Sequence, residues 1–224
     1  MISLDKPRRV FDPFALLERM VPPPWPHLLL RACAIGVLIV FLVHRIGAYR
    51  TYLFKPLWVV ETLVYVVFIV SYAVRADPVV RSKGLREVVV PLVGALLPFA
   101  LLAAPPSPLV NASGFRLACV FSFMTVATVF TLWGLWSLRR AFSITVEART
   151  LVTGGPYRWV RHPVYLGEML TAAAVALWRL TPANIGIFLF FAAVQLLRAR
   201  WEETKLSAAL PGFAAYARRV WWFW

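Results

Sequence analysis

The stretch VYLGEMLTAAAVALWRLTPANIGIFLFFAAVQLL (residues 164–197) holds two apolar segments separated by a four-residue turn, TPAN. The first covers about Val164–Leu180 and the second about Ile185–Leu197. A membrane-spanning helix takes about 20 residues, with about 17 as a lower limit, so both segments are marginal in length. Proline and asparagine favour turns, and so short a connection places the two segments side by side in antiparallel orientation. The stretch therefore predicts a tight helical hairpin.

Four further apolar segments precede this hairpin. They cover about Leu28–Val43, Leu57–Val74, Val88–Ala104 (interrupted by Pro91 and Pro98) and Phe115–Leu138. Hydrophobic residues make up 61% of the 224-residue chain, against about 45–50% in soluble domains, and only 15% of residues are charged. The sequence predicts an all-α integral membrane protein with about six membrane segments.

The basic residues predict the orientation of these segments. If all six cross the membrane, eighteen of the 24 lysines and arginines flank one side and only Arg45, Arg50, Lys55 and Arg179 flank the other. Basic residues gather on the cytoplasmic side of membrane proteins. We therefore expect both termini to be cytoplasmic, most simply in a bacterial inner membrane.

The N-terminal segment, residues 1–27, is expected to lie in the cytoplasm. It has no apolar core next to its basic residues, so it does not resemble a secretory signal. A short amphipathic helix around Phe11–Met20 could rest on the membrane surface.

The composition also argues against other classes of protein. The net charge is +14, but the basic residues lie at the ends of apolar segments, which indicates contact with membrane lipids and their anionic headgroups rather than with nucleic acid. The two cysteines, Cys33 and Cys119, and the three histidines are scattered without ligand spacing. We therefore predict no metal held by protein ligands.

One polar junction, TGGPYRWVRHPVYLGEML (residues 153–170), interrupts the apolar pattern. Pro163 suits the first turn of a helix, which places His162 next to the cap, where free backbone N–H groups attract anions. Arg158 and Arg161 add further donors. This junction predicts a pocket for a carboxylate or a phosphate.

The helix that follows carries a second group of polar residues. Tyr165 and Glu168 are three residues apart and share a face, and Gly167 removes bulk beside them. An ionisable residue within a membrane helix is a candidate for function because its burial is costly. The simpler interpretation is that Glu168 pairs with a nearby arginine.

The end of the sixth segment, QLLRARWEETKL (residues 195–206), complements this junction. Gln195, Arg198, Glu202 and Lys205 form one polar stripe at helical spacing, and Glu203 is adjacent. An ordinary ion pair between Arg198 and Glu202 is the alternative reading. The hairpin would bring this stripe beside Tyr165 and Glu168. S-adenosylmethionine, with its carboxylate, ammonium, diol, adenine and sulfonium, is one ligand that fits such a site, although the residues alone do not single it out.

The C-terminal third, about Leu151–Val220, resembles the isoprenylcysteine carboxyl methyltransferase family and the related phospholipid N-methyltransferases. The resemblance is carried by LVTGGPYRWVRHPVYLGE (residues 151–168), the pair Glu202–Glu203 and LPGFAAYARRV (residues 210–220). It implies an integral membrane methyltransferase that uses S-adenosylmethionine. Residues 28–138 then form membrane helices one to four, and residues 139–224 form the methyltransferase-like region with the cytoplasmic cofactor site.

The resemblance also implies a set of site residues. The cofactor-binding set is Leu151, Val152, Gly155, Pro156, Tyr157, Arg161, His162, Pro163, Tyr165, Gly167, Glu202 and Glu203. We expect Tyr165, Glu168 and Arg198 to be the catalytic residues. The acceptor is expected to be a lipidic or prenylated small molecule that enters from the bilayer. A carboxylate is the first choice because it needs no general base, whereas an amine would need Glu168 or Tyr165 to take its proton.

Two alternatives remain at this point. Membrane sterol reductases hold NADPH at the same face with a similar C-terminal architecture, but they usually have a longer bundle. A non-catalytic transporter or scaffold would distribute polar residues at mid-depth and could contain internal repeats, but the third and fourth segments contain almost no ionisable residue.

Overall fold

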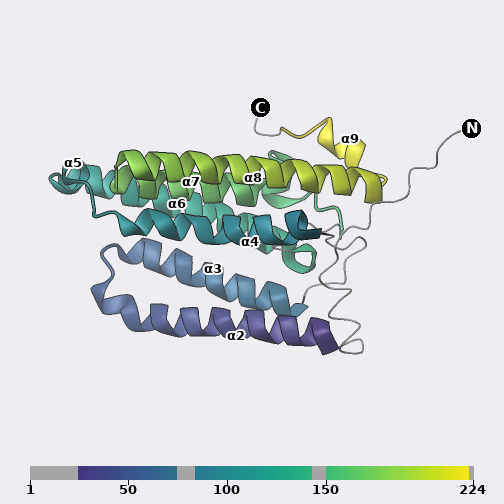
Figure 1. Cartoon of the computed structure of the whole chain (residues 1–224), viewed down its shortest axis with the longest axis horizontal. Helices are drawn as coiled ribbons and strands as arrows, with labels where there is room; N and C mark the ends of the chain where they lie inside the picture. The colour runs from purple at the N-terminus through teal and green to yellow at the C-terminus, as the bar shows by residue number, and fades with distance from the viewer. Residues whose placement is uncertain (1–24, 75–83, 143–149, 222–224) are drawn as a thin grey trace, which may run out of the picture.

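The computed structural model describes residues 25–74, 84–142 and 150–221 (Figure 1). Six longer helices make up most of this part of the chain: α2 (Trp25–Gly47), α3 (Lys55–Val74), α4 (Gly84–Ala100), α6 (Gly114–Leu138), α7 (Pro163–Trp178) and α8 (Pro182–Ala209). Between and after them lie the short helices α5 (Pro108–Asn111) and α9 (Phe213–Ala217) and the 3-10 turns η1 (Ala48–Thr51), η2 (Leu101–Ala103), η3 (Arg139–Ala141) and η4 (Gly155–Arg158).

Four of these helices, α2, α3, α6 and α8, are long and apolar enough to cross a membrane. Two shorter apolar helices accompany them, over Val89–Ala103 and Pro163–Trp178. The predicted all-helical architecture is confirmed over the described residues, and the length and composition of these helices agree with the predicted integral membrane protein. Six crossings remain a prediction, and the helix expected around residues 11–20 lies outside the described residues.

Helix α8 is longer than its apolar segment predicted. It begins under a cap in which the Thr181 hydroxyl accepts the backbone N–H of Asn184 at 3.1 Å, and it continues through the charged residues to Ala209, two residues before Pro211. Between Ile185 and Ala209 no proline interrupts the backbone hydrogen bonds. Helix α4 in turn runs through Pro91 and Pro98 and passes into η2.

The predicted hairpin of the last two helices is confirmed. Only Arg179, Leu180 and Thr181 separate α7 from α8. The buried Asn184 amide fixes the turn, because it donates to the carbonyl oxygen of Arg179 at 2.8 Å and to that of Leu101 at 3.0 Å. This turn lies at the opposite end of the bundle from α9 (Figure 1). The N-terminus of α7 and the C-terminus of α8 therefore meet at the α9 end.

Close packing between α6 and α7 is the centre of the bundle. A Cβ on Gly167 would lie 2.9 Å from the backbone nitrogen of Thr131, and a Cβ on Gly134 would lie 2.9 Å from the side chain of Val164. Contacts of this kind leave no room for a side chain, so both glycines let the two helices approach. This packing fixes the start of α7 relative to α6.

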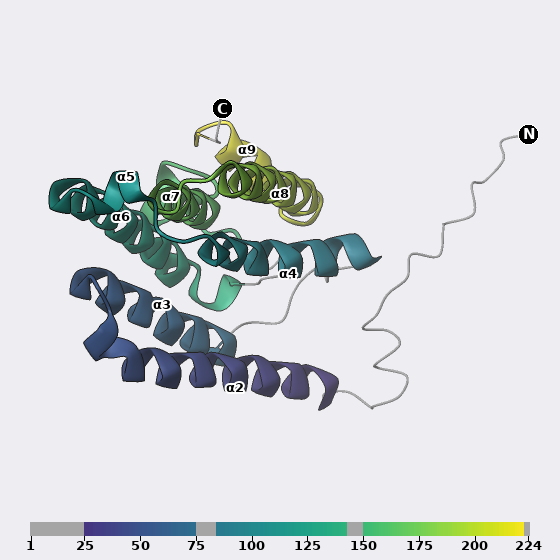
Figure 2. The same cartoon turned by 60° about the vertical axis from the view of Figure 1, so that its left-hand side comes forward.

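The α2–α3 pair forms a separate layer beside the other helices (Figures 1 and 2). Helix α3 packs on α6, and α2 contacts mainly α3. Most of the described apolar side chains of α2 are exposed, as expected where lipid replaces protein as the neighbour. Phe142 joins the layers, because its ring makes edge contacts with Phe68 and Tyr72 of α3 at 5.2 and 5.7 Å between centroids.

Candidate functional site

The polar junction folds into η4 followed by the start of α7. Gly155 adopts a φ of 59°, a conformation that favours glycine, and a side chain there would collide with Ser137 of α6. As predicted, Pro163 is the first residue of α7 and His162 is its N-cap. The imidazole does not cap the helix. It is buried and turns toward α8 instead.

Glu203 of α8 binds two residues of the junction, Arg161 and His162, and we call this contact the clasp. Arg161 Nη1 donates to Glu203 Oε2 at 2.9 Å and to Oε1 at 3.1 Å, and His162 Nε2 lies 2.9 Å from Oε1. The sequence predicted a pocket for an anion at this place. The carboxylate found against Arg161 and His162 belongs to the protein itself, and it ties the end of α8 to the start of α7.

Glu202, the other member of the glutamate pair, faces Tyr165 and the cavity rather than the clasp. The hydroxyl of Tyr165 donates to its carboxylate, so α7 and α8 are joined a second time. The Tyr165 ring has an aromatic neighbour, His162, and a cationic neighbour, Arg198. The His162 ring stacks on it at 5.6 Å with an interplanar angle of 5°, and the Arg198 guanidinium lies 4.7 Å from its centroid.

Arg198 and Glu168 complete this network. The side chain of Gln195 accepts a hydrogen bond from Arg198 Nη1 at 2.7 Å, and its amide donates to Glu168. Gln195 and Arg198 are both buried. The predicted stripe on α8 and the predicted face of α7 therefore do meet, through the bond of Gln195 to Glu168 and that of Tyr165 to Glu202.

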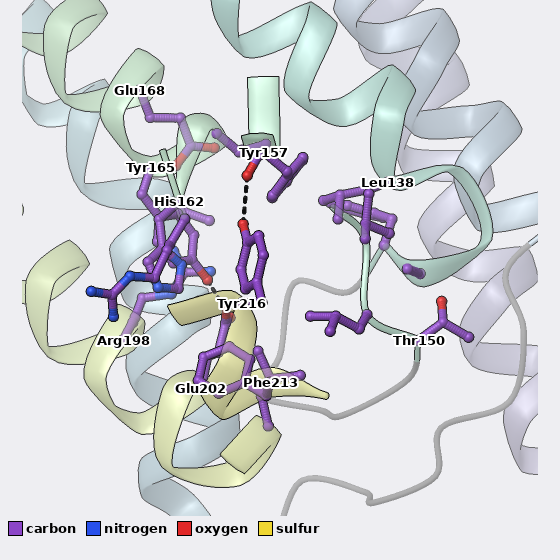
Figure 3. A pocket seen from close by; sticks show the side chains of 18 of the residues that line it. Leu138, Thr150, Tyr157, His162, Tyr165, Glu168, Arg198, Glu202, Phe213 and Tyr216 are labelled. Carbon is purple, nitrogen blue, oxygen red and sulfur yellow. Dashed lines mark hydrogen bonds between the residues drawn. The ribbon is translucent and has the colours of Figure 1, made fainter. Parts of the chain in front are cut away.

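A cavity with about 1080 Å³ of empty space, part of it open to solvent, adjoins this network (Figure 3). One wall is polar and comes from the junction before α7, from α7 and from α8, with Arg161, His162, Tyr165, Glu168, Arg198 and Glu202. The facing wall is apolar and comes from α3, α4, α6 and η3, with Phe68, Ala95, Leu138, Ala141 and Phe142. Two walls of opposite character suit a ligand that has a polar and an apolar part.

The C-terminal segment covers one side of the cavity. Phe213 and Tyr216 of α9 line it, and the Tyr216 hydroxyl donates to the Tyr157 carbonyl oxygen at 2.7 Å (Figure 3). The backbone beyond α9 is held by Arg161, whose Nε donates to the Val220 carbonyl oxygen and whose backbone N–H donates to that of Trp221, both at 3.0 Å. Arg161 thus connects the clasp by Glu203 to the position of α9.

Both tyrosines of this cover stay protonated at neutral pH. Burial raises the pKa of Tyr157 well above its usual value, and the nearby Glu202, Tyr216 and Glu168 raise it further. Burial also raises the pKa of Tyr216 to about 12, against an opposing effect of Arg161. The Tyr216 hydroxyl therefore keeps the proton that it donates to Tyr157.

The cavity brings together nine of the residues predicted from the sequence. They are Leu151, Val152, Tyr157, Arg161, His162, Tyr165, Glu168, Arg198 and Glu202. Gly155, Pro156, Pro163, Gly167 and Glu203 belong to the scaffold that surrounds it. Gly167, for example, faces α6 rather than a ligand, and Glu203 is occupied by the clasp.

Two polar residues of the predicted constellations point elsewhere. Arg158 is exposed, with its guanidinium 4.6 Å from the centroid of the neighbouring Trp159. Lys205, the last member of the α8 stripe, forms an ion pair with Glu87 of α4 at 2.5 Å.

Most of the apolar wall was not predicted from the sequence. Phe68, Ala95, Leu138, Ala141, Phe142, Thr150, Leu206, Phe213 and Tyr216 line the cavity but were not selected. Phe213 and Tyr216 lie in the LPGFAAYARRV stretch that supported the family resemblance, so that motif could have identified them. The others are apolar or small residues within or beside membrane helices, and nothing in the sequence distinguishes them from residues that face lipid.

Residues 115–210, which include all of the polar cavity wall, match the family model described as phospholipid methyltransferase. This part of the chain is similar to that family, whose methyltransferases use S-adenosylmethionine, and it includes two of the four helices that are long and apolar enough to cross a membrane. The match begins upstream of the Leu151–Val220 resemblance and takes in nearly all of α6. It supports the phospholipid methyltransferase relationship, whereas the isoprenylcysteine branch is not specifically supported.

A curated relative is the cobalt-zinc-cadmium resistance protein CzcN of Cupriavidus metallidurans, which is 35% identical over 99 residues. The aligned region covers 43% of this chain and 43% of the relative, so the chain spans less than half of that protein's length. Among the residues that the structure describes, no group of three or more histidine, cysteine or acidic residues could hold a metal ion.

Proposed function

We propose that the chain transfers a methyl group from S-adenosylmethionine to a nucleophile on a lipidic acceptor at the cytoplasmic face of the membrane. The observation that carries this proposal is the cavity between α7, α8 and α9, with a charged wall facing an apolar one. A small cofactor with several polar groups suits the first wall, and an acyl or prenyl chain suits the second.

The charged wall fits the donor groups of S-adenosylmethionine. Arg198, held by Gln195 and stacked on Tyr165, offers a buried cation for the carboxylate. Glu202 offers a carboxylate for the ammonium group or the ribose diol. Leu151 and Val152, from the loop before η4, supply apolar surface for the adenine. Arg161, His162 and Glu203 act mainly by fixing the junction.

When bound, S-adenosylmethionine supplies an electrophilic methyl group on a sulfonium. The protein's part is to align the acceptor with that methyl group and to keep water away, and such positioning accounts for much of the catalysis of a transfer between bound reactants. The α9 cover, held through Tyr216 and Arg161, excludes solvent from one side of the cavity.

The apolar wall indicates an acceptor that reaches the cavity from the bilayer. Phe68 of α3 and Ala95 of α4 both line it, and these two helices make few direct contacts with each other. A chain of methylene groups between α3 and α4 would be continuous with the surrounding lipid. Because burial of each methylene is favourable by about 0.8 kcal/mol, such a wall selects lipidic acceptors over soluble ones.

A carboxylate is our first choice for the nucleophile, because it is already ionised at neutral pH and needs no general base. An amine is a second candidate, and the position of Glu168 favours it. Glu168 lines the cavity and accepts a hydrogen bond from Gln195, so its carboxylate is placed to take a proton from an ammonium acceptor.

The experiment is a transfer assay with S-adenosylmethionine that carries a radiolabelled methyl group. Purified protein in lipid nanodiscs receives either prenylated thiol carboxylates or aminophospholipids as acceptors. Alkali releases methanol from a methyl ester but leaves an N-methyl group in place, so the product reports the nucleophile. We expect label in the lipid fraction of one acceptor class. Absence of label with both classes, together with saturable binding of NADPH, would favour the reductase alternative.

A matched variant separates the two nucleophiles further. Glu168→Gln keeps the shape of the side chain and removes its ability to take a proton. Transfer to an amine should fall by about 100-fold or more, the usual contribution of a general base, whereas transfer to a carboxylate should change little. An equal loss with both acceptors would mean that Glu168 acts on cofactor binding instead.

A further inference from the structure

A cluster of arginine and tryptophan side chains lies at the cavity end of the bundle but outside the cavity. It consists of Trp133, Trp136 and Arg139 at the end of α6 and of Arg158 and Trp159 at the end of η4. We call these five residues the Arg–Trp patch. The patch is separate from the proposed methyl-transfer site, because none of the five side chains lines the cavity.

Ring contacts connect the two elements of the patch. Trp133 and Trp159 meet edge to face, with 5.3 Å between their centroids. The Arg139 guanidinium lies 5.6 Å from the Trp136 centroid, and the Arg158 guanidinium lies 4.6 Å from the Trp159 centroid. The patch is therefore an arranged surface, formed where η4 packs against α6, and not a set of unrelated side chains.

The patch is exposed, and its charge is not neutralised by the described part of the chain. Trp136 and Trp159 are 54% and 50% exposed, and both arginines are exposed. Within the described residues, neither Arg139 nor Arg158 forms an ion pair with a carboxylate. By contrast, Arg179, which also lies over a tryptophan at the far end of the bundle, donates to the carbonyl oxygens of Leu102 and Ala104.

The backbone holds Arg139 in an uncommon conformation. Its φ of 43° is the one positive value among the described residues other than glycine. A side chain in this region of φ and ψ is unfavourable by about 1–3 kcal/mol and is retained where the surroundings or a function require it. Here the conformation ends α6 and leaves the guanidinium over Trp136.

The position of the patch identifies its partner. Helix α6 has 25 residues, a length of about 37 Å, so it exceeds the hydrocarbon core of about 30 Å and its end reaches the headgroup level. Tryptophan favours this level, and arginine there attracts anionic headgroups. Arginine also binds phosphate through two parallel N–H donors. We infer that the Arg–Trp patch is a binding site for the phosphate headgroup of an anionic phospholipid in the cytoplasmic leaflet.

Native mass spectrometry of the detergent-purified full chain tests this inference, with phosphatidylglycerol and phosphatidylcholine as probes. The test variant R139Q/R158Q removes both patch charges. The control R50Q/R116Q removes two exposed arginines at the opposite end, one of them on the same helix. We expect the wild type and the control to prefer phosphatidylglycerol, and R139Q/R158Q to bind it about 30-fold more weakly. Binding of phosphatidylcholine should be unchanged in all three.

Three results would overturn the inference. One is equal loss in both double variants, which would show a general effect of net charge. Another is unchanged binding by R139Q/R158Q. The third is that an acidic peptide displaces bound phosphatidylglycerol at a lower concentration than added free phosphatidylglycerol does. This result would indicate a protein partner. If R139Q/R158Q does not fold because of the backbone at Arg139, R158Q alone should show about a fivefold loss, and no loss in R158Q would contradict the site equally.

Discussion

The two ends of the helical bundle each contain an arginine–glutamate ion pair and a tyrosine that donates to a glutamate, yet only one end has the features of a site. At the far end, Arg45 pairs with Glu61, and the Tyr52 hydroxyl donates to the same carboxylate at 2.5 Å. At the α9 end, Arg161 pairs with Glu203, and Tyr165 donates to Glu202. The acids, cations and phenols are of the same kinds in both places.

The difference is what surrounds them. Glu61 does not line the cavity at the α9 end, and its ion pair with Arg45 holds α2 against α3. At the α9 end a second carboxylate, a stacked guanidinium and a buried imidazole line open space opposite an apolar wall. An ionisable residue in a membrane helix is therefore informative only when its neighbours leave room for a ligand. Matched changes at the two ends test this conclusion.

The largest difference is expected between Glu202→Gln and Glu61→Gln. Each variant removes one charge from a tyrosine-bonded carboxylate. Loss of a charged hydrogen-bond partner weakens binding by about 1.5–3 kcal/mol, so Glu202→Gln should lower the affinity for S-adenosylhomocysteine by about 10- to 100-fold. Glu61→Gln should leave it unchanged. Isothermal titration calorimetry in detergent measures both, and a comparable loss in the two variants would remove the distinction between the ends.

Gly167→Ala should have the next largest effect. The added methyl group would lie 2.9 Å from the Thr131 backbone nitrogen, and overpacking of this kind destabilises a fold by about 1–3 kcal/mol. Gly36→Ala on α2 is the control, because no atom lies within 4 Å of its Cβ position. Equilibrium unfolding in mixed micelles gives both free energies. A neutral Gly167→Ala would show that α6 and α7 are not closely packed.

Glu203→Gln tests the clasp. We expect the free energy of unfolding to fall by about 1–2 kcal/mol, because the pair is partly exposed and solvent screens it. The C-terminal segment should also loosen, since Arg161 connects the clasp to Val220. Limited trypsin digestion at Arg218 and Arg219 should become faster than in Glu87→Gln, which breaks the Lys205 ion pair instead. Equal digestion rates would contradict the connection.

The smallest effect is expected from Tyr216→Phe, compared with Tyr52→Phe. Each variant loses one hydroxyl donor, which changes stability by about 0.5–1.5 kcal/mol. Of these two variants, only Tyr216→Phe should speed the release of S-adenosylhomocysteine, because Tyr216 lines the cavity and Tyr52 does not. Stopped-flow dissociation kinetics measure this, and an equal effect of Tyr52→Phe would exclude a cover function for α9.

Tyr216 also predicts how stability depends on pH. Its pKa is about 12 in the folded chain and about 10 when unfolded, so the unfolded chain releases the proton first. The free energy of unfolding should therefore decrease as the pH rises from about 10 toward 12. Tyr216→Phe should lose less stability than the wild type over this range. Parallel profiles for the two proteins would show that Tyr216 does not contribute.

The polar half of the site could be predicted from the sequence, and the apolar half could not. Arg161, His162 and Glu203 stand out because charged residues are costly within a mostly apolar chain, and the TPAN turn brings their helices together. Sequence spacing did not tell which glutamate faces the cavity, because adjacent residues on a helix point about 100° apart. Phe68, Ala95 and Leu138 look like any lipid-facing residue until tertiary packing directs them inward.

The helix ends show the same division. The start of α7 at Pro163 follows from local chemistry, since proline favours the first helical turn, and the sequence predicted it. The extension of α8 to Ala209 was not predicted from hydropathy, because the helix continues through polar residues that pack on α4, α7 and the junction. Hydropathy reports on the solvent around a segment, whereas helix length also depends on partners within the protein.

The most direct test of the site is an experimental structure determined with saturating S-adenosylhomocysteine. We expect its density between α7, α8 and α9, in contact with Arg198 and Glu202, and with Glu203 still bound to Arg161. Density at the Arg45–Glu61 end, or a protein that takes up no ligand at saturation, would contradict the assignment of this cavity to the methyl donor.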